Sequence, residues 1–171
     1  MNMKTSFIAT VVALATVCSF SASAAQKDIT VTASVDSTIE FLQADGSSLP
    51  STIKLDFLPG TGLAHKVIKT RVYSNDMTKA VNVKLLNTPQ LANVVDPTQS
   101  IDVDVKLGGK SLTTSDTKLD ATTLFPGGKA DLNGGSVSLD LDIGQKGAAA
   151  AVLPAGDYSG MVSVVLSQAT A

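Results

Sequence analysis

The sequence predicts an all-β fold, a sandwich of short strands. Short segments in which apolar and polar residues alternate recur along the chain, and a period of two is typical of strands with one buried face. Gly and Pro, present 13 and 6 times, separate these segments. Glu and Arg each occur once, so the polar residues that favour long surface helices are scarce. Many short strands divided by turn residues favour a sandwich.

The first residues are expected to lie outside this fold. Lys4 is followed by an apolar run and then by Ala22-Ser23-Ala24, the small-residue pattern of a secretory signal peptide, so cleavage is predicted after Ala24. The signal peptide is thus residues 1–24. A membrane anchor is the first alternative, but the run has only about 14 residues, whereas a bilayer span needs roughly 20. Lipid attachment at Cys18 is the second alternative, although the residues before it lack the small residue expected at such a cut.

The remaining chain is expected to fold as one domain without disulfides, because Cys18, the only cysteine of the sequence, is removed with the signal peptide. Without Lys4 the 13 Lys and Arg become 12, against 15 Asp and Glu, which gives a net charge of −3. No basic patch indicates nucleic-acid binding, and no basic amphipathic helix indicates a membrane surface. No stretch after Ala24 is apolar enough to span a membrane.

The N-terminal half of the chain contains five predicted strands. The first alternates Ile29, Val31, Ala33 and Val35 with polar residues. The turn sequence ADGSSLPS separates the second from the third, and LPGTG and NDMTK end the third and fourth. The five predicted ranges are 28–36, 38–43, 52–57, 66–74 and 80–86. A looser segment follows, with a short helical turn expected at 89–95.

The C-terminal half contains three more predicted strands and one ambiguous segment. Residues 100–107 alternate strongly, and the glycines after them predict a hairpin at 108–112. Residues 117–125 fit either a strand or a short helix. The last two strands are predicted at 136–143 and 158–167, the latter with Tyr158, Val162, Val164 and Leu166 on one face.

Residues with catalytic or metal-binding chemistry are few. His65 is the only histidine and no GxSxG motif accompanies it, so a Ser-His-Asp arrangement has no support and a surface histidine is the simpler interpretation. The carboxylate pairs Asp102/Asp104 and Asp140/Asp142 are able in principle to bind calcium, but they occupy the polar positions of alternating strands. The segment 131–135, DLNGG, is interpreted as a turn. We therefore expect no enzyme, metal or cofactor site.

Several blocks, in order along the chain, resemble the major pilins of alpha-clade (class 5, CFA/I-type) chaperone–usher fimbriae. They are DITVTASVD, LQADGSSLPS, SNDMTKAVNVKL, NTPQLANVV and AGDYSGMVSVVLS. The resemblance extends over nearly the whole chain after the signal peptide. It departs at Asp36-Ser37, where family members often have Asp-Pro, and at Tyr73, where they often have His.

The resemblance implies a function for the N-terminal strand. Such subunits are incomplete immunoglobulin-like sandwiches that lack their last strand, and a donor strand from a neighbouring subunit completes them. Residues 25–37 are then the donor segment, with Ile29, Val31, Ala33 and Val35 inserted into the neighbour, and residues 38–171 are the pilin domain. The acceptor groove is lined by Tyr158, Gly160, Val162, Val164 and Leu166, and Gly160 either leaves space for an incoming side chain or marks a bulge.

The resemblance also implies partners and a location. The chain is expected to be the major shaft subunit of an adhesive fimbria, secreted through the periplasm to the cell surface. Its implied partners are further copies of itself, a periplasmic chaperone, an outer-membrane usher and a tip adhesin. One alternative is a pilin that itself binds host glycan or lipid, through an exposed Tyr73 or the cations Lys66, Lys69 and Arg71. Another is a monomeric secreted sandwich in which both terminal strands pair within one domain.

Overall fold

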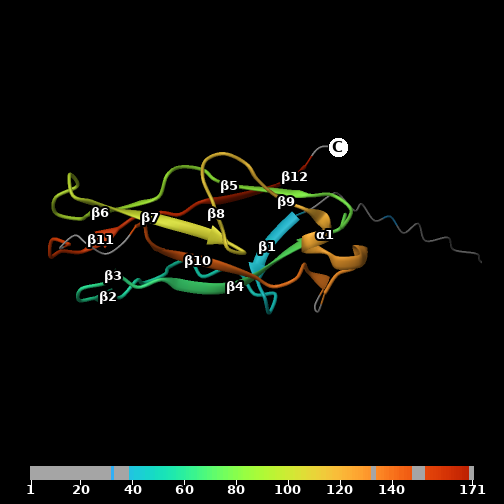
Figure 1. The fold of residues 1–171 in the computed structure, drawn as a ribbon, viewed down its shortest axis with the longest axis horizontal. Helices are drawn as coiled ribbons and strands as arrows, with labels where there is room; N and C mark the ends of the chain where they lie inside the picture. The colour runs from blue at the N-terminus through green and yellow to red at the C-terminus, as the bar shows by residue number, and fades with distance from the viewer. Residues whose placement is uncertain (1–31, 33–38, 132–133, 148–152, 170–171) are drawn as a thin grey trace, which may run out of the picture. The chain divides into compact units, whose positions relative to one another are not determined.

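The computed structural model describes residues 32, 39–131, 134–147 and 153–169. The chain divides into two units, residues 1–34 and 35–171, and the second contains every strand discussed below. Its fold is all-β, with two main sheets that share one hydrophobic core (Figure 1). The predicted signal peptide and the predicted strand 28–36 lie outside the described residues, apart from Thr32, which is exposed.

The larger sheet has the strand order β1-β4-β10-β7-β6-β11, with the short strand β8 paired to β7. The neighbouring strands are antiparallel. Their bounds are β1 Ile39–Gln43, β4 Lys66–Ser74, β6 Gln90–Asn93, β7 Ser100–Leu107, β8 Lys110–Ser111, β10 Leu139–Gln145 and β11 Tyr158–Ser159.

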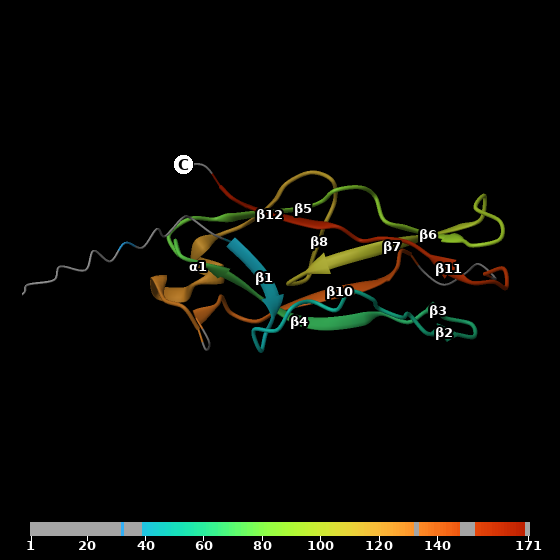
Figure 2. The ribbon, with the colours of Figure 1, turned by 180° about the vertical axis from the view of Figure 1, so that it is seen from behind.

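The smaller sheet has the order β12-β5-β9, and a separate two-stranded hairpin is formed by β2 and β3. The bounds are β5 Val81–Leu85, β9 Thr117–Leu119, β12 Val164–Gln168, β2 Phe57–Leu58 and β3 Gly62–Leu63. A short helix, α1 Ala121–Leu124, and a 3₁₀ turn, η1 Pro126–Gly128, follow β9 (Figure 2). No helix among the described residues is long and apolar enough to cross a membrane.

The core forms where the inward faces of the two sheets meet. The alternation seen in the sequence buries Val81, Val83 and Leu85 of β5 to 3% exposure or less. The same period of two buries alternate residues on β4, β7 and β10. Because each of these strands has one face on the core, the predicted strands 38–43, 66–74, 80–86, 100–107 and 136–143 are all found, with shifts at their ends.

Three local predictions differ from the structure. Residues 52–57 are not a ladder strand: only Phe57 and Leu58 pair, in the β2–β3 hairpin. The helical turn expected at 89–95 is instead strand β6, whose pairing with β7 supplies hydrogen bonds that a lone turn lacks. The segment 158–167 is not one strand but two, β11 in the larger sheet and β12 in the smaller.

Two predictions for turns and ambiguous segments are resolved. The hairpin at 108–112 is present, because Gly108 and Gly109 adopt the positive φ angles of 56° and 80° that a two-residue hairpin turn requires. The ambiguous segment 117–125 contains both elements, β9 and then α1.

Candidate functional site: an open edge at the C-terminal strand

Strand β12 is an edge strand of the smaller sheet. It pairs with β5 along its whole length, from Val164 opposite Leu85 to Gln168 opposite Val81. Within the described part of the chain, no strand is hydrogen-bonded to its other side. An unpaired edge presents free backbone donors and acceptors, which are a template for an additional strand.

The core is incompletely covered along this edge. Val164 and Leu166 point toward the core and pack against it, yet both remain partly exposed. The inward residues of the adjacent strand β5 are almost fully buried. Val165, on the outer face of β12, is 37% exposed. The difference between β5 and β12 shows that no strand of the described residues covers the core beside β12.

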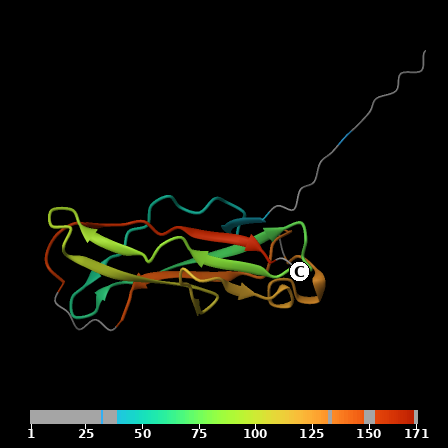
Figure 3. The same cartoon turned by 90° about the horizontal axis from the view of Figure 1, so that it is seen from above.

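A second set of partly buried apolar side chains lies on the other side of this edge. β1 lies close to β12 without pairing with it, and the chain after β1 turns at residues 44–46 and then runs past Ile53 toward β2 (Figure 3). Ile39, Phe41, Leu49 and Ile53 all pack against the core while staying partly exposed. Residues 49–55 make no backbone hydrogen bond within the described part of the chain. This extended segment therefore has strand-like alternation but no pairing partner.

The predicted acceptor residues fall into two groups. Val162, Val164 and Leu166 pack against the core at the open edge. Tyr158 belongs to β11, pairs with Asn93 of β6, and donates its hydroxyl to the Pro154 carbonyl at 3.0 Å. Gly160 lies between the two groups, where the chain leaves one sheet for the other.

Packing within the domain itself explains why residue 160 is a glycine. A β carbon at this position would overlap the backbone carbonyl oxygen of Gln90. The glycine therefore permits a close approach between the chain and β6, at the point where the strand is interrupted. The predicted donor residues Ile29, Val31, Ala33 and Val35 lie outside the described residues.

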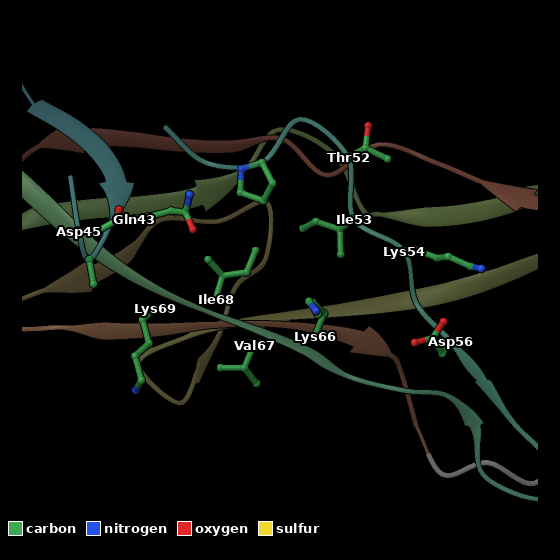
Figure 4. Close-up of a pocket in the computed structure, with 12 residues that line it drawn as sticks. Gln43, Asp45, Thr52, Ile53, Lys54, Asp56, Lys66, Val67, Ile68 and Lys69 are labelled. Carbon is green, nitrogen blue, oxygen red and sulfur yellow. The ribbon is translucent and has the colours of Figure 1, made fainter. Parts of the chain in front are cut away.

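A cleft of about 670 Å³ lies between β4 and the extended segment after β1 (Figure 4). Ile53 and Ile68 point into the space between these two segments, and Lys54, Lys66 and Lys69 lie around it. Lys69 forms an exposed ion pair with Asp140 at 3.2 Å. The cleft thus opens beside the same unpaired segment that borders the open edge.

Of the residues in the alternative receptor-binding prediction, Arg71 is buried and Tyr73 is only partly exposed. Arg71 is 8% exposed, and its Nη1 donates to Asp131 Oδ2 at 2.8 Å and to the Ser136 carbonyl at 2.6 Å. The ring of Tyr73 packs against Gly135, and its hydroxyl is buried. Arg71 therefore does not extend a basic surface with Lys66 and Lys69, and Tyr73 does not present an exposed ring.

The residues considered for catalysis or metal binding have simple partners. His65 Nδ1 lies 2.9 Å from Asp142 Oδ1, at the surface of β10. Asp104 pairs with Lys106 at 3.3 Å, and Asp102 accepts a hydrogen bond from Gln90. In the described ranges, no three His, Cys, Asp or Glu side chains gather as a metal site. Of the segment 131–135, residues 132–133 lie outside the described residues, and the Asp131 N–H donates to the Gly135 carbonyl at 2.8 Å.

The two sheets with an open edge at β12 define the class of protein: an all-β, immunoglobulin-like pilin domain. Residues 25–167 match the family model for the CS1 type fimbrial major subunit. The chain therefore belongs to this family, and it is a major fimbrial subunit, a component of fimbriae at the cell surface.

Curated relatives agree with this assignment. The chain is similar to a CFA/I fimbrial subunit of Escherichia coli O78:H11, with 43% identity over 149 residues covering 86% of this chain and 87% of that protein. It is also 39% identical to a CS1 fimbrial subunit of Escherichia coli over 152 residues, covering 87% and 88% of the two chains.

Solved structures show the same fold. The CooA pilin subunit from enterotoxigenic Escherichia coli matches with a TM-score of 0.68 and 35% identity, over 78% of this chain and 88% of that one. A structure described as a chaperone–tip adhesin complex of CFA/I fimbriae biogenesis matches with a TM-score of 0.50 and 16% identity, over 77% of this chain and 43% of that one. This second likeness concerns the fold alone.

Proposed function

We propose that this subunit polymerises by donor-strand exchange, with β12 and the extended segment 49–56 as the two walls of the acceptor groove. The incomplete coverage of Val164 and Leu166, beside a fully covered β5, is the observation that carries this proposal. An inserted strand would pair with the free edge of β12 on one side. It would also give residues 49–55 the backbone partners that they lack in the described chain.

The donor is the segment 28–36 of the next subunit. Adding a strand to an open edge supplies backbone hydrogen bonds, and alternate side chains enter the core. Ile29, Val31 and Val35 are the bulky residues of the inserted face, and Ala33 is the small one. Burying three large aliphatic side chains contributes on the order of 5–9 kcal/mol before entropy, and each backbone bond adds about 0.5–1.5 kcal/mol.

This contact is head-to-tail, so each subunit gives one strand and receives one. A heterologous contact that does not close into a ring generates an open filament. The periplasmic chaperone would cover the same edge before assembly, and the outer-membrane usher would exchange it for the donor strand. The subunit would then form a homopolymeric shaft below a tip adhesin. We assign this shaft subunit no catalytic role, because His65 and Asp142 form a surface pair without a neighbouring nucleophile among the described contacts.

The first test is electrophoresis of sheared surface fibres in SDS, with and without boiling. A ladder that collapses to one band on boiling is expected, because strand exchange would hold the polymer without covalent bonds and the chain after the predicted cleavage site has no cysteine for a disulfide. A monomer in both lanes contradicts the proposal and favours a sandwich closed by its own N-terminal strand.

Substitutions on the two faces of β12 sharpen the test. Leu166→Asp places a charge on the core-facing side and is expected to abolish the ladder, whereas Val165→Asp on the outer face leaves it intact. Val31 belongs to the proposed donor segment and not to residues 38–171, so Val31→Asp separates loss of donation from misfolding. Subunits with Val31→Asp should still accept a strand, and co-expression with wild type should shorten the ladder.

A further inference from the structure

Strand β1, which follows the predicted donor segment in the sequence, begins at the end of the domain that carries α1. Ile39 begins β1 and pairs with Ser74, the last residue of β4. Figures 1 and 2 show that β1 begins at the end of the domain that carries α1, and that β12 ends in the same direction. Only two residues separate Asp36, the end of the predicted donor, from Ile39.

Two loops lie at the opposite end of the domain, and we name them the distal tips. One is the β2–β3 hairpin, residues 57–63, and the other is the β6–β7 turn, residues 93–99. All three views of the fold place both loops at the end away from α1. The extended segment 49–56 runs directly into the first tip. The chain before β12 pairs with the second, through Tyr158 opposite Asn93.

The distal tips expose large apolar side chains. Phe57 is 55% exposed, Leu58 46%, Val94 62% and Val95 90%. Apolar side chains gathered at one end of a soluble domain are typical of a contact surface. These four residues are the exposed large hydrophobic residues of the described chain that lie on the two tips.

Both distal tips are held in a fixed conformation. Asn93 is buried, and its Oδ1 accepts from the N–H groups of Val95 at 2.9 Å and Asp96 at 3.1 Å. Asp96 in turn accepts from the Thr98 hydroxyl. The other tip is tied to β10, where the Leu63 N–H donates to Gln145 Oε1 at 2.9 Å. A preorganised surface loses little conformational entropy on binding.

The short link before Ile39 determines which neighbour reaches the distal tips. Three Cα–Cα steps of 3.8 Å span at most about 11 Å, so the body of the donating subunit must lie against the end of the groove where its strand finishes. Suppose that the received strand finished at the α1 end. The subunit that donates this strand would then occupy the same space as the subunit that accepts the strand preceding Ile39. A linear polymer therefore needs the received strand to finish at the distal tips.

We propose that the distal tips of one subunit contact the α1-bearing end of the next copy along the fibre. This inference rests on the proposed strand exchange, but it assigns a second contact outside the groove. Phe57, Leu58, Val94 and Val95 are its apolar residues. Their burial against the neighbour adds stability that the donor strand alone does not provide.

Paired cysteines in assembled fibres test this contact directly, because the chain beyond the predicted signal peptide contains none. We would combine Val95→Cys with Thr122→Cys of α1, oxidise intact fibres and boil them in SDS without reductant. Multimers that survive boiling and collapse with reductant are expected. Each single variant should give at most dimers, because one cysteine per subunit links only two chains.

The matched control moves the first cysteine to Leu86, which is 70% exposed but lies just after β5 and not on a tip. The inference is overturned if Leu86→Cys crosslinks to Thr122→Cys as efficiently as Val95→Cys does. The inference is also overturned if the variant with Val95→Cys and Thr122→Cys gives no boiling-resistant multimers. In both cases an intact unboiled ladder shows that strand exchange itself stands, whereas loss of the wild-type ladder contradicts the proposed function.

A second variant pair measures the contribution of the tips without new bonds. Val94→Ser with Val95→Ser is expected to leave the unboiled ladder in place but to speed its dissociation about tenfold on warming, since two apolar side chains lose their buried contact. Leu86→Ser is the control and should not change the rate. Equal rates for the tip variant and wild type contradict the inference.

Discussion

Gly160 lies against the backbone carbonyl of Gln90 so closely that a β carbon would overlap the oxygen. The contact forms where the C-terminal chain leaves β11 in the larger sheet and turns toward β12 in the smaller sheet. It fixes the start of the open edge relative to β6. Because the obstacle is backbone and not a flexible side chain, it has little freedom to move aside.

Gly160→Ala is therefore expected to destabilise the domain by about 1–3 kcal/mol, the usual cost of forcing extra volume into a packed site. The neighbouring Met161→Ala is the control, because Met161 is 73% exposed and its truncation should have little effect. Urea unfolding of the subunit, supplied with a synthetic peptide of residues 28–36, measures both variants. An unchanged midpoint for Gly160→Ala would show that β6 yields to the new side chain.

Arg71 and Lys69 lie on the same strand and form ion pairs that are expected to contribute very differently to the free energy of unfolding. Arg71 is buried and donates to both Asp131 and the Ser136 carbonyl, whereas the Lys69 side chain is 71% exposed. Arg71→Met is expected to cost about 1–3 kcal/mol, because the Ser136 carbonyl loses a charged donor in a buried place. Lys69→Met should change stability by less than about 1 kcal/mol. Equal effects of the two substitutions in thermal unfolding would refute this assignment.

Alternation predicts best the strands whose inward face is buried by their own domain. On β5 and β7, for example, every second residue is a core residue, so the periodicity and the structure agree. The same alternation at 52–57 does not produce a ladder. Periodicity reports which faces are apolar, and it does not say whether the backbone has a partner within the chain.

The site is partly predictable for the same reason. The alternation places Val162, Val164 and Leu166 on one face, and they do pack against the core at the open edge, whereas their role in a groove is implied only by the resemblance to pilins. The second wall, at residues 49–56, is not predicted, although Ile53 and Leu55 carry the signal as alternating apolar residues. The exposed Val94 and Val95 are also missed, because a turn built around a buried Asn93 gives the sequence no periodicity.

Three aspartates in the turns respond to acid in the same way. Asp45, Asp76 and Asp96 each accept hydrogen bonds from the hydroxyl and the N–H of a Ser or Thr two residues later. These bonds, the hydroxyl first, lower the pKa of each carboxyl below its ordinary value. A lowered folded-state pKa stabilises the fold above the unfolded-state pKa, and this contribution is lost as the pH falls through the folded value.

The triple variant Asp45→Asn, Asp76→Asn and Asp96→Asn is expected to lose less stability than wild type between neutral pH and about pH 3. An asparagine oxygen accepts the same bonds but does not titrate in this range. Thermal unfolding midpoints at the two pH values measure the difference. If wild type and the variant fall by the same amount, these turns do not contribute to acid sensitivity.

The two walls of the proposed groove predict a specific pattern of amide exchange. In the isolated subunit, the amides of residues 52–55 should exchange quickly, because they have no backbone partner in the described chain, while those of β5 stay protected between β12 and β9. In the assembled fibre the inserted strand should protect residues 52–55 and the free edge of β12 together. Hydrogen–deuterium exchange of fibres and of the subunit, compared residue by residue, measures both walls. Protection that appears at β12 but not at residues 52–55 would mean that the donor strand pairs with one wall only.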